Sequence, residues 1–305
     1  MRLSVPVSLR SKRALRMLSL STLALSIVSC GGSGGGGAPA VLQDVILIVR
    51  GHGVSNESTL AMVDPDGTNL RFISNATGWQ PSPHPDGSRI VFNKGDNIAT
   101  IKPDGSGLQY LTNSNLDFEP EYSPDGTKIV FTSQRDGNAE IYVMNADGSA
   151  ETRLTNEAGD DSNPCWSPDG QYIAFTSDRD TNGKIWRIDA NGSNPTKLTD
   201  TVSIDYYPAW SPDGTKIIFT RGSVFWTMNA DGSNQALFPN LADSDSEWLP
   251  AWSPDGTKLV YLRALTSGYN RVRVVNSDGT NDVNLVAGPD VQEQNPVFAK
   301  LLLKP

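Results

Sequence analysis

The sequence predicts an all-β fold, a six-bladed β-propeller with four strands in each blade. Five Pro-Asp-Gly turns recur along the chain, and the successive steps between their aspartates are 39, 44, 44 and 42 residues. Six Asp-Gly or Asn-Gly turns alternate with them, at 66–67, 104–105, 147–148, 191–192, 231–232 and 278–279. A repeat of this length with two hairpin turns per unit is typical of propellers, whose blades bury their faces against one another.

Each Pro-Asp-Gly turn is followed by a short run of β-branched and aromatic residues. KIVFTS at 128–133, YIAFTS at 172–177 and KIIFTR at 216–221 are examples, and their length and composition favour buried strands. Proline fixes φ at one position of the turn, and glycine adopts the positive φ that the turn requires. We therefore expect an innermost strand before each turn and a second strand after it.

The two ends of the repeat region predict how the ring closes. The first unit begins with VILIVR, residues 45–50, and lacks an innermost strand, which explains why the second kind of turn occurs once more than the first. EQNPVFAK, residues 293–300, resembles the start of an innermost strand and stops where its turn would come. We expect this C-terminal strand to complete the first blade. Residues 45–305 would then form the propeller and leave no open sheet edge.

The first 44 residues predict export and anchoring. Residues 1–29 combine five basic residues with an apolar run at 17–28 that is too short to span a bilayer, as in secretory signals. The segment Ile27-Val28-Ser29-Cys30 resembles the bacterial lipobox and implies that Cys30 is lipidated. The alternative is an ordinary secretory signal with a chance cysteine. Residues 30–44 contain a glycine-rich stretch at 31–40, and we expect them to act as a flexible tether.

The charge of the mature chain excludes two classes of partner. Removing residues 1–29 deletes five basic residues and no acidic ones, which takes the formal net charge from −9 to −14. Such a surface repels nucleic acid and anionic lipid headgroups, so we expect membrane contact only through the lipid anchor. Cys165 has no disulfide partner once Cys30 is lipidated, and we expect a buried thiol there.

The repeats resemble a known family. The pattern P-x-[WY]-S-P-D-G recurs at the innermost strands. TSQRDGN and TSDRDTN occur after the second strand of two blades, and RLTN and KLTD occur in the fourth strand of two blades. These features are similar to the Pro-Asp repeats of the TolB-like, WD-repeat-related propellers, and the resemblance covers about residues 45–300. It implies the fold and no single activity. The second blade departs from the pattern, with Pro83-His84 where other blades have Trp-Ser or Tyr-Ser.

An acidic position recurs three residues before the proline of the innermost strands. It is Gly78 in one blade and acidic in the other five: Asp117, Asp161, Asp205, Glu247 and Glu293. The next position is aromatic in four blades: Trp79, Phe118, Tyr206 and Trp248. We expect both sets at the axial mouth on the face of the blade-to-blade crossovers, where they would bind a cation, a basic peptide segment or a sugar. The alternative is that each acid caps the backbone of a neighbouring strand.

Two further sets of residues repeat from blade to blade. Large aromatic side chains two residues after the proline are expected to wedge between blades: Tyr122, Trp166, Trp210, Trp252 and Phe298. Charged side chains in the loops between second and third strands are expected on the crossover face as solvated or paired groups: Arg50, His52, Arg135, Asp136, Arg179, Asp180 and Arg263.

The sequence favours binding over catalysis. His52 and His84 are expected on opposite faces and cannot share a metal or a triad, and the chain has no CxxC, HExxH or phosphate-binding loop. We predict a non-catalytic monomer without metal or cofactor, anchored by lipid at the periplasmic face of the outer membrane, which binds an envelope protein or peptide at its crossover face. A carbohydrate-binding surface lipoprotein is one alternative. A glycosidase or lyase that uses a pair of the acids is the other.

Overall fold

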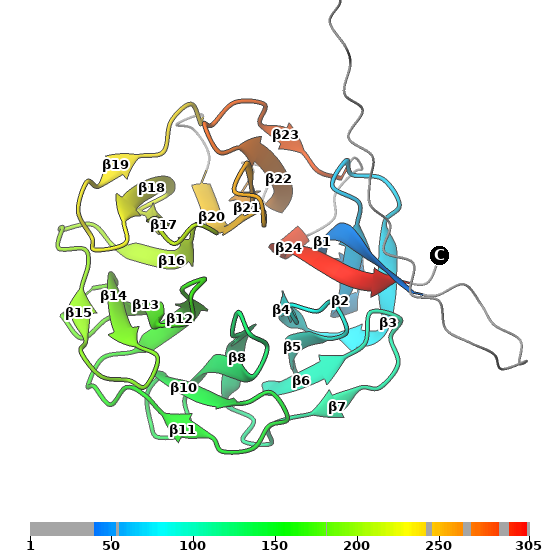
Figure 1. The fold of residues 1–305 in the computed structure, drawn as a ribbon, viewed down its shortest axis with the longest axis horizontal. Coiled ribbons are helices and arrows are strands. Elements are labelled where there is room, and N and C mark those ends of the chain that lie inside the picture. Colours follow the sequence, from blue (N-terminus) through cyan, green and yellow to red (C-terminus); the bar gives the residue numbers. More distant parts are fainter. Residues whose placement is uncertain are drawn as a thin grey trace, which may run out of the picture. The chain divides into compact units, whose positions relative to one another are not determined.

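The computed structural model describes residues 40–52, 55–180, 182–241, 246–264, 270–286 and 293–303. In these ranges the chain forms strands and no helix, and the strands make six antiparallel sheets of four, arranged as a ring (Figure 1). The predicted signal segment, Cys30 and most of the predicted tether lie outside the described residues. The prediction of a six-bladed propeller is confirmed.

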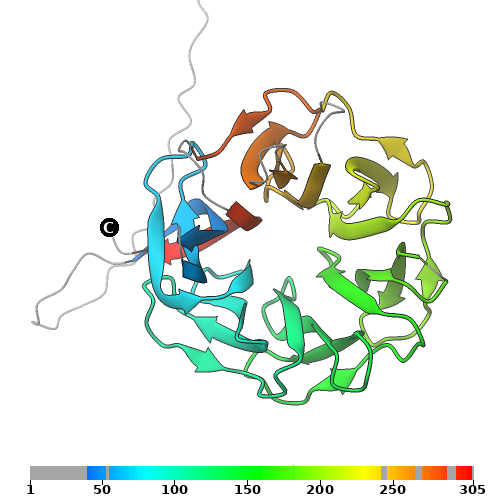
Figure 2. The same ribbon diagram turned by 180° about the vertical axis from the view of Figure 1, so that it is seen from behind.

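Each blade runs from an innermost strand at the axis to an outer strand, as Figure 2 shows from the opposite side. The outer strand has two residues in blades 2 to 6 and seven in blade 1. Blade 1 consists of β24 (Glu293–Leu303), β1 (Val41–His52), β2 (Ser55–Val63) and β3 (Arg71–Thr77). Blade 2 consists of β4 (Trp79–Pro83), β5 (Ile90–Lys94), β6 (Asn97–Ile101) and β7 (Gln109–Tyr110). Blade 3 consists of β8 (Asp117–Tyr122), β9 (Lys128–Ser133), β10 (Glu140–Asn145) and β11 (Thr152–Arg153).

The remaining blades repeat this order. Blade 4 consists of β12 (Asp161–Trp166), β13 (Tyr172–Ser177), β14 (Lys184–Asp189) and β15 (Thr196–Lys197). Blade 5 consists of β16 (Asp205–Trp210), β17 (Lys216–Arg221), β18 (Val224–Asn229) and β19 (Ala236–Leu237). Blade 6 consists of β20 (Ser246–Trp252), β21 (Lys258–Ala264), β22 (Asn270–Asn276) and β23 (Val283–Asn284).

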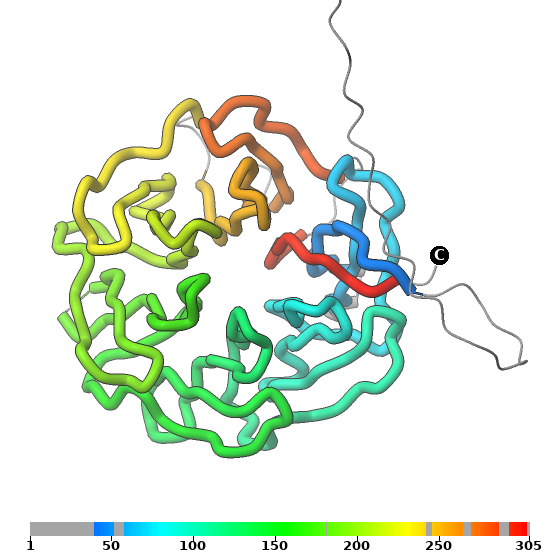
Figure 3. Tube along the Cα trace, viewed as in Figure 1, coloured from blue at the N-terminus to red at the C-terminus, as the bar shows by residue number. Residues whose placement is uncertain are grey.

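The C-terminal strand closes the ring as predicted. β24 pairs antiparallel with β1, from Val41 opposite Leu303 to Arg50 opposite Glu293, and the blue segment of β1 and the red segment of β24 lie side by side in Figure 3. β24 continues past residue 300, and Leu301 is fully buried in a cluster that includes side chains of blade 2. The Leu302 N–H donates a hydrogen bond to the Gly87 carbonyl of blade 2 at 3.0 Å. The strand therefore joins blade 1 to blade 2 as well as completing its own sheet.

Hairpin geometry gives the ring two distinct faces. The Pro-Asp-Gly turns and the third-to-fourth strand turns lie on one face, which we call the turn face. The second-to-third strand loops and the crossovers from one blade to the next lie on the other, the crossover face. The two faces differ because antiparallel neighbours reverse direction at alternate ends of the sheet.

The Pro-Asp-Gly turns are held by their aspartates. In the turn at 211–215, the Ser211 hydroxyl and the Thr215 N–H donate to Asp213 Oδ1 at 2.6 Å and 3.0 Å. Gly214 has a φ of +70°, and a Cβ at this position would lie 3.3 Å from Cγ of Pro168 in the turn of the neighbouring blade. Glycine therefore allows the turns of adjacent blades to pack closely.

The hydrophobic core lies between the blades. Trp166 of blade 4, for example, is buried with Val130 and Ile141 of blade 3, and Trp210 of blade 5 packs with Ile185 of blade 4. Tyr122 of blade 3 joins a cluster with Val91 and other side chains of blade 2. Trp252 and Phe298 are only partly buried, in the interfaces between blades 5 and 6 and between blades 6 and 1. The predicted role of these aromatic residues as wedges between blades is confirmed.

Candidate functional site

The five predicted acids are buried inside the blades. Their exposed fractions are 0–1%. Four of them form ion pairs with an arginine of the same blade, at 2.7–2.8 Å: Asp117–Arg135, Asp161–Arg179, Asp205–Arg221 and Glu247–Arg263. The fifth, Glu293, accepts a hydrogen bond from the Val272 N–H at 2.8 Å, which is the backbone capping that we considered as the alternative. The acids are thus engaged with the chain's own groups.

The arginines of these pairs also contact aromatic rings. Arg221 donates through Nε and Nη2 to the two oxygens of Asp205, at 2.7 Å and 3.0 Å. Its guanidinium carbon lies 5.1 Å from the ring centroid of Phe219 and 4.6 Å from that of Trp226. Hydrogen bonds to the carboxylate and contact with the rings compensate for the loss of water around both charges.

The pKa values of two equivalent acids shift in opposite directions. Burial favours a higher pKa for Asp117, but hydrogen bonds from Ser114, Arg135 and Ser133 bring the pKa below its ordinary value. Burial raises the pKa of Asp161, and Ser177 and Arg179 only partly offset it. Repeated sequence positions therefore do not imply the same electrostatic environment.

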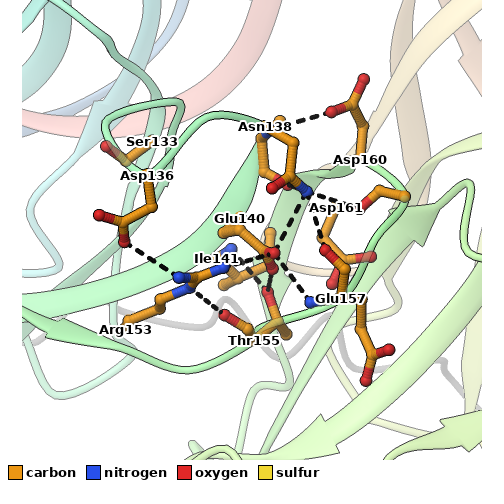
Figure 4. A network of polar contacts seen from close by, with 12 residues as sticks. Ser133, Asp136, Asn138, Glu140, Ile141, Arg153, Thr155, Glu157, Asp160 and Asp161 are labelled. Carbon is orange, nitrogen blue, oxygen red and sulfur yellow. Dashed lines mark hydrogen bonds and ion pairs between the residues drawn. The ribbon is translucent and has the colours of Figure 1, made fainter.

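One buried acid lies outside the predicted set. Glu140, at the start of β10, is fully buried and accepts hydrogen bonds from Arg153, Thr155 and the Glu157 N–H, at 2.7, 2.6 and 2.8 Å (Figure 4). This network fixes the crossover from blade 3 to blade 4. Nothing in the sequence pattern indicated that Glu140 would be buried, since an acid that follows a loop is usually solvated.

The four predicted aromatic residues have different surroundings. Trp79 packs against the cluster that joins blades 1 and 2, and Phe118 and Tyr206 are half-buried. Trp248 is 46% exposed. Other large apolar side chains are exposed in the crossovers as well: Leu116, Val202 and Ile204. The crossover face of blades 3 to 6 therefore carries several apolar side chains in contact with water.

A central cavity of about 530 Å³ runs along the axis. Each innermost strand contributes its proline and the residues on either side of it, and prolines of four Pro-Asp-Gly turns extend the lining to the turn face. None of the nine predicted ligand-binding residues lines this cavity. The axial lining instead begins with the residues immediately before the prolines: Gln80, Glu119, Asn163, Tyr207, Leu249 and Asn295.

A β-bulge explains which residues reach the axis. All six pre-proline residues have φ between +44° and +56°, an uncommon conformation for residues other than glycine. At these residues each innermost strand also shifts its register against the second strand of the blade. In blade 3, for example, the shift lies between Phe118 and Glu121. The bulge interrupts the alternation of faces along the strand, so residues before and after it cannot be placed by a period of two.

Two carboxyl groups line the cavity. Glu119 accepts hydrogen bonds from the Thr132 hydroxyl and the Asn163 N–H, both at 2.7 Å. Glu121 accepts one from the Trp166 N–H at 3.1 Å. Burial raises the pKa of both groups and brings that of Glu121 to about 7. Glu121 is therefore the acid in the cavity with fewer hydrogen bonds to its charged form.

Features expected of a metalloenzyme are not found in the described part of the chain. It contains no group of three His, Cys, Asp or Glu side chains that could hold a metal ion. His84 on the turn face contacts Asp86 and the Gly126 carbonyl, whereas the His52 side chain lies outside the described set. Cys165 is a buried free thiol. The described residues also contain no helix that is long and apolar enough to cross a membrane.

A closed ring of six four-stranded blades around an axial cavity defines a six-bladed β-propeller. Residues 37–302 match the family model described as TolB beta propeller domain, and the chain belongs to this family. A Tol-Pal system protein TolB from Cereibacter sphaeroides is 29% identical over 139 residues, which are 38% of this chain and 30% of that protein. Tricorn protease homolog 1 from Streptomyces coelicolor is 36% identical over 74 residues, 24% of this chain and 7% of that protein.

Solved structures support the same fold. The crystal structure of TolB from Acinetobacter baumannii superimposes with a TM-score of 0.73 at 24% identity, covering 84% of this chain and 66% of that one. An oligogalacturonate lyase in complex with manganese has a TM-score of 0.52 at 15% identity, with 82% and 75% covered. The matched residues span less than a third of the length of the curated relatives described above.

Proposed function

We propose that this protein is a non-catalytic, exported and lipid-anchored envelope protein that binds a protein partner on its crossover face. The observation that carries this proposal is the group of exposed apolar side chains on the crossovers: Leu116, Val202, Ile204 and Trp248. All four belong to the crossover side of the ring, where Val202 and Ile204 lie two residues apart, and exposed apolar patches mark interaction sites. The name of the TolB relatives assigns them to the Tol-Pal system, and the shared propeller supports a binding role here.

The structure of blade 5 connects this surface with the axis. A Cβ added at Gly183 would lie 2.9 Å from the Ile204 side chain and 3.1 Å from the Tyr206 ring, so both side chains border this glycine. The Tyr206 ring lies 5.9 Å from the ring of Tyr207, which lines the cavity. Tryptophan and tyrosine are the side chains that most often dominate binding energy at protein interfaces. We therefore assign Tyr206 and Trp248 to the proposed contact surface.

Trp248 is expected to be a principal contact with the partner. Its replacement by serine should weaken binding by roughly tenfold or more, because the loss of an aromatic anchor at the centre of an interface costs about 2 kcal/mol or more. A photo-crosslinking amino acid at position 248 should capture the partner in intact cells. The matched control is position 237, because Leu237 is 51% exposed on the outer strand β19. Equal capture from both positions, or capture from 237 alone, would contradict a crossover-face site.

Replacement of Cys30 by serine should release the protein from membranes. The thiol is the group that lipidation modifies, so the variant should move to the soluble fraction and fail to incorporate labelled palmitate. Cys165→Ser is the matched control, since this thiol is buried in the propeller and its replacement should leave the protein in membranes. Retention of the Cys30→Ser variant in the membrane fraction would refute the lipid anchor.

A further inference from the structure

The described lining of the central cavity contains acidic side chains and no basic one. Each of the six innermost strands places a proline in it, which has no N–H to donate: Pro81, Pro120, Pro164, Pro208, Pro250 and Pro296. Among the described residues that line the cavity there is no lysine, arginine or histidine. The cavity therefore holds two carboxyl groups and no cationic side chain to pair with them.

The two carboxyl groups differ in how well the chain satisfies them. Glu119 is held by Thr132 and by two groups of Asn163. Glu121 has the single hydrogen bond from the Trp166 backbone. Its equivalents in the other blades carry no charge: Ser82, Cys165, Ala209, Ala251 and Val297. Glu121 is thus one acceptor, specific to blade 3, in a space where the protein offers it little compensation.

We propose that the central cavity binds an organic ammonium group, with the Glu121 carboxylate as its counter-ion. The cation would supply the positive charge that the described lining lacks. Aromatic side chains also line the cavity, and aromatic rings favour a cation over a neutral guest: Trp166, Tyr207, Trp210 and Trp252. The volume of about 530 Å³ has room for a small amine or for the end of a lysine side chain, together with water.

The same geometry disfavours a divalent metal. Ca²⁺ and Mg²⁺ take about six or more oxygen ligands, whereas Glu119 is already engaged with Thr132 and Asn163. A single ion pair with one free carboxylate needs no such coordination shell. None of the residues assigned to the proposed crossover-face surface lines the cavity. The two proposals rest on different residues, so each can fail without the other.

The cation can be tested with two probes that represent its two sources. Cadaverine represents a free amine, and acetyl-Gly-Lys-Gly-amide represents a lysine side chain of a protein. Their neutral counterparts are 1,5-pentanediol and acetyl-Gly-norleucine-Gly-amide. We expect titration calorimetry to detect binding of at least one cation and of neither neutral analogue, and the cation that binds identifies the source.

Protonation of Glu121 gives a second readout. Because the pKa of Glu121 is about 7, the proton competes with the cation, and affinity at about pH 6 should be roughly tenfold lower than at about pH 8. Glu121→Gln should lower the affinity at about pH 8 by at least about tenfold. Asp44→Asn, which removes one exposed charge outside the cavity, should bind as the wild type does. No binding of either cation, or equal affinity in Glu121→Gln, would overturn the proposal.

Discussion

Replacing Arg221 by alanine is expected to lower the free energy of unfolding by about 3–5 kcal/mol. Asp205 is fully buried, and Arg221 contacts both of its oxygens. Without the guanidinium, a carboxylate remains in the protein interior with neither water nor a counter-ion. The variant also loses the contact of Arg221 with the Phe219 and Trp226 rings. Both losses act in the folded state only.

Urea unfolding followed by tryptophan fluorescence measures this effect. Lys300→Ala is the matched control, because the Lys300–Asp44 pair lies on the surface at 3.8 Å and surface pairs contribute about 0–1 kcal/mol. In an Asp205→Ala background, Arg221→Ala should cost less than it does alone, since no charge is then left unpaired. A cost of Arg221→Ala no greater than that of Lys300→Ala would show that the pair does not stabilise the blade.

The architecture could be predicted from the sequence because it depends on local signals. Each Pro-Asp-Gly turn fixes the end of an innermost strand through backbone preferences that hold in any context, as the φ of +70° at Gly214 shows. The closing strand β24 was predictable for the same reason, since it copies the start of a strand but lacks the turn. Repetition then turns several weak signals into one strong prediction.

The placement of site residues could not be predicted in the same way. A strict alternation of faces would place Asp117 and Glu119 on the same side of the strand, yet Asp117 is buried in an ion pair and Glu119 lines the cavity. The bulge at the pre-proline residue breaks the alternation. The arginine that pairs with each acid lies 16 or 18 residues further along the chain, and only packing of the blade brings the two together.

Glu121 should make the stability of the protein depend on pH in the direction opposite to that of a salt-bridged acid. Burial raises its pKa from 4.5 to about 7 in the folded state, so the folded protein binds this proton more tightly than the unfolded chain. The stabilisation is complete below about pH 4.5 and is lost as the pH rises through about 7. The shift corresponds to at most about 3 kcal/mol, and water in the cavity reduces it.

The Glu121→Gln variant isolates this contribution. Its side chain stays neutral, so it should be more stable than the wild type at about pH 8, by up to about 3 kcal/mol, and nearly equal to it at about pH 4.5. Urea unfolding of both proteins at a series of pH values gives the difference directly, and effects of other acids cancel. A difference that does not grow with pH would mean that Glu121 is ionised without penalty in the cavity. The greater stability of Glu121→Gln above neutrality also means that its loss of cation binding cannot be attributed to unfolding.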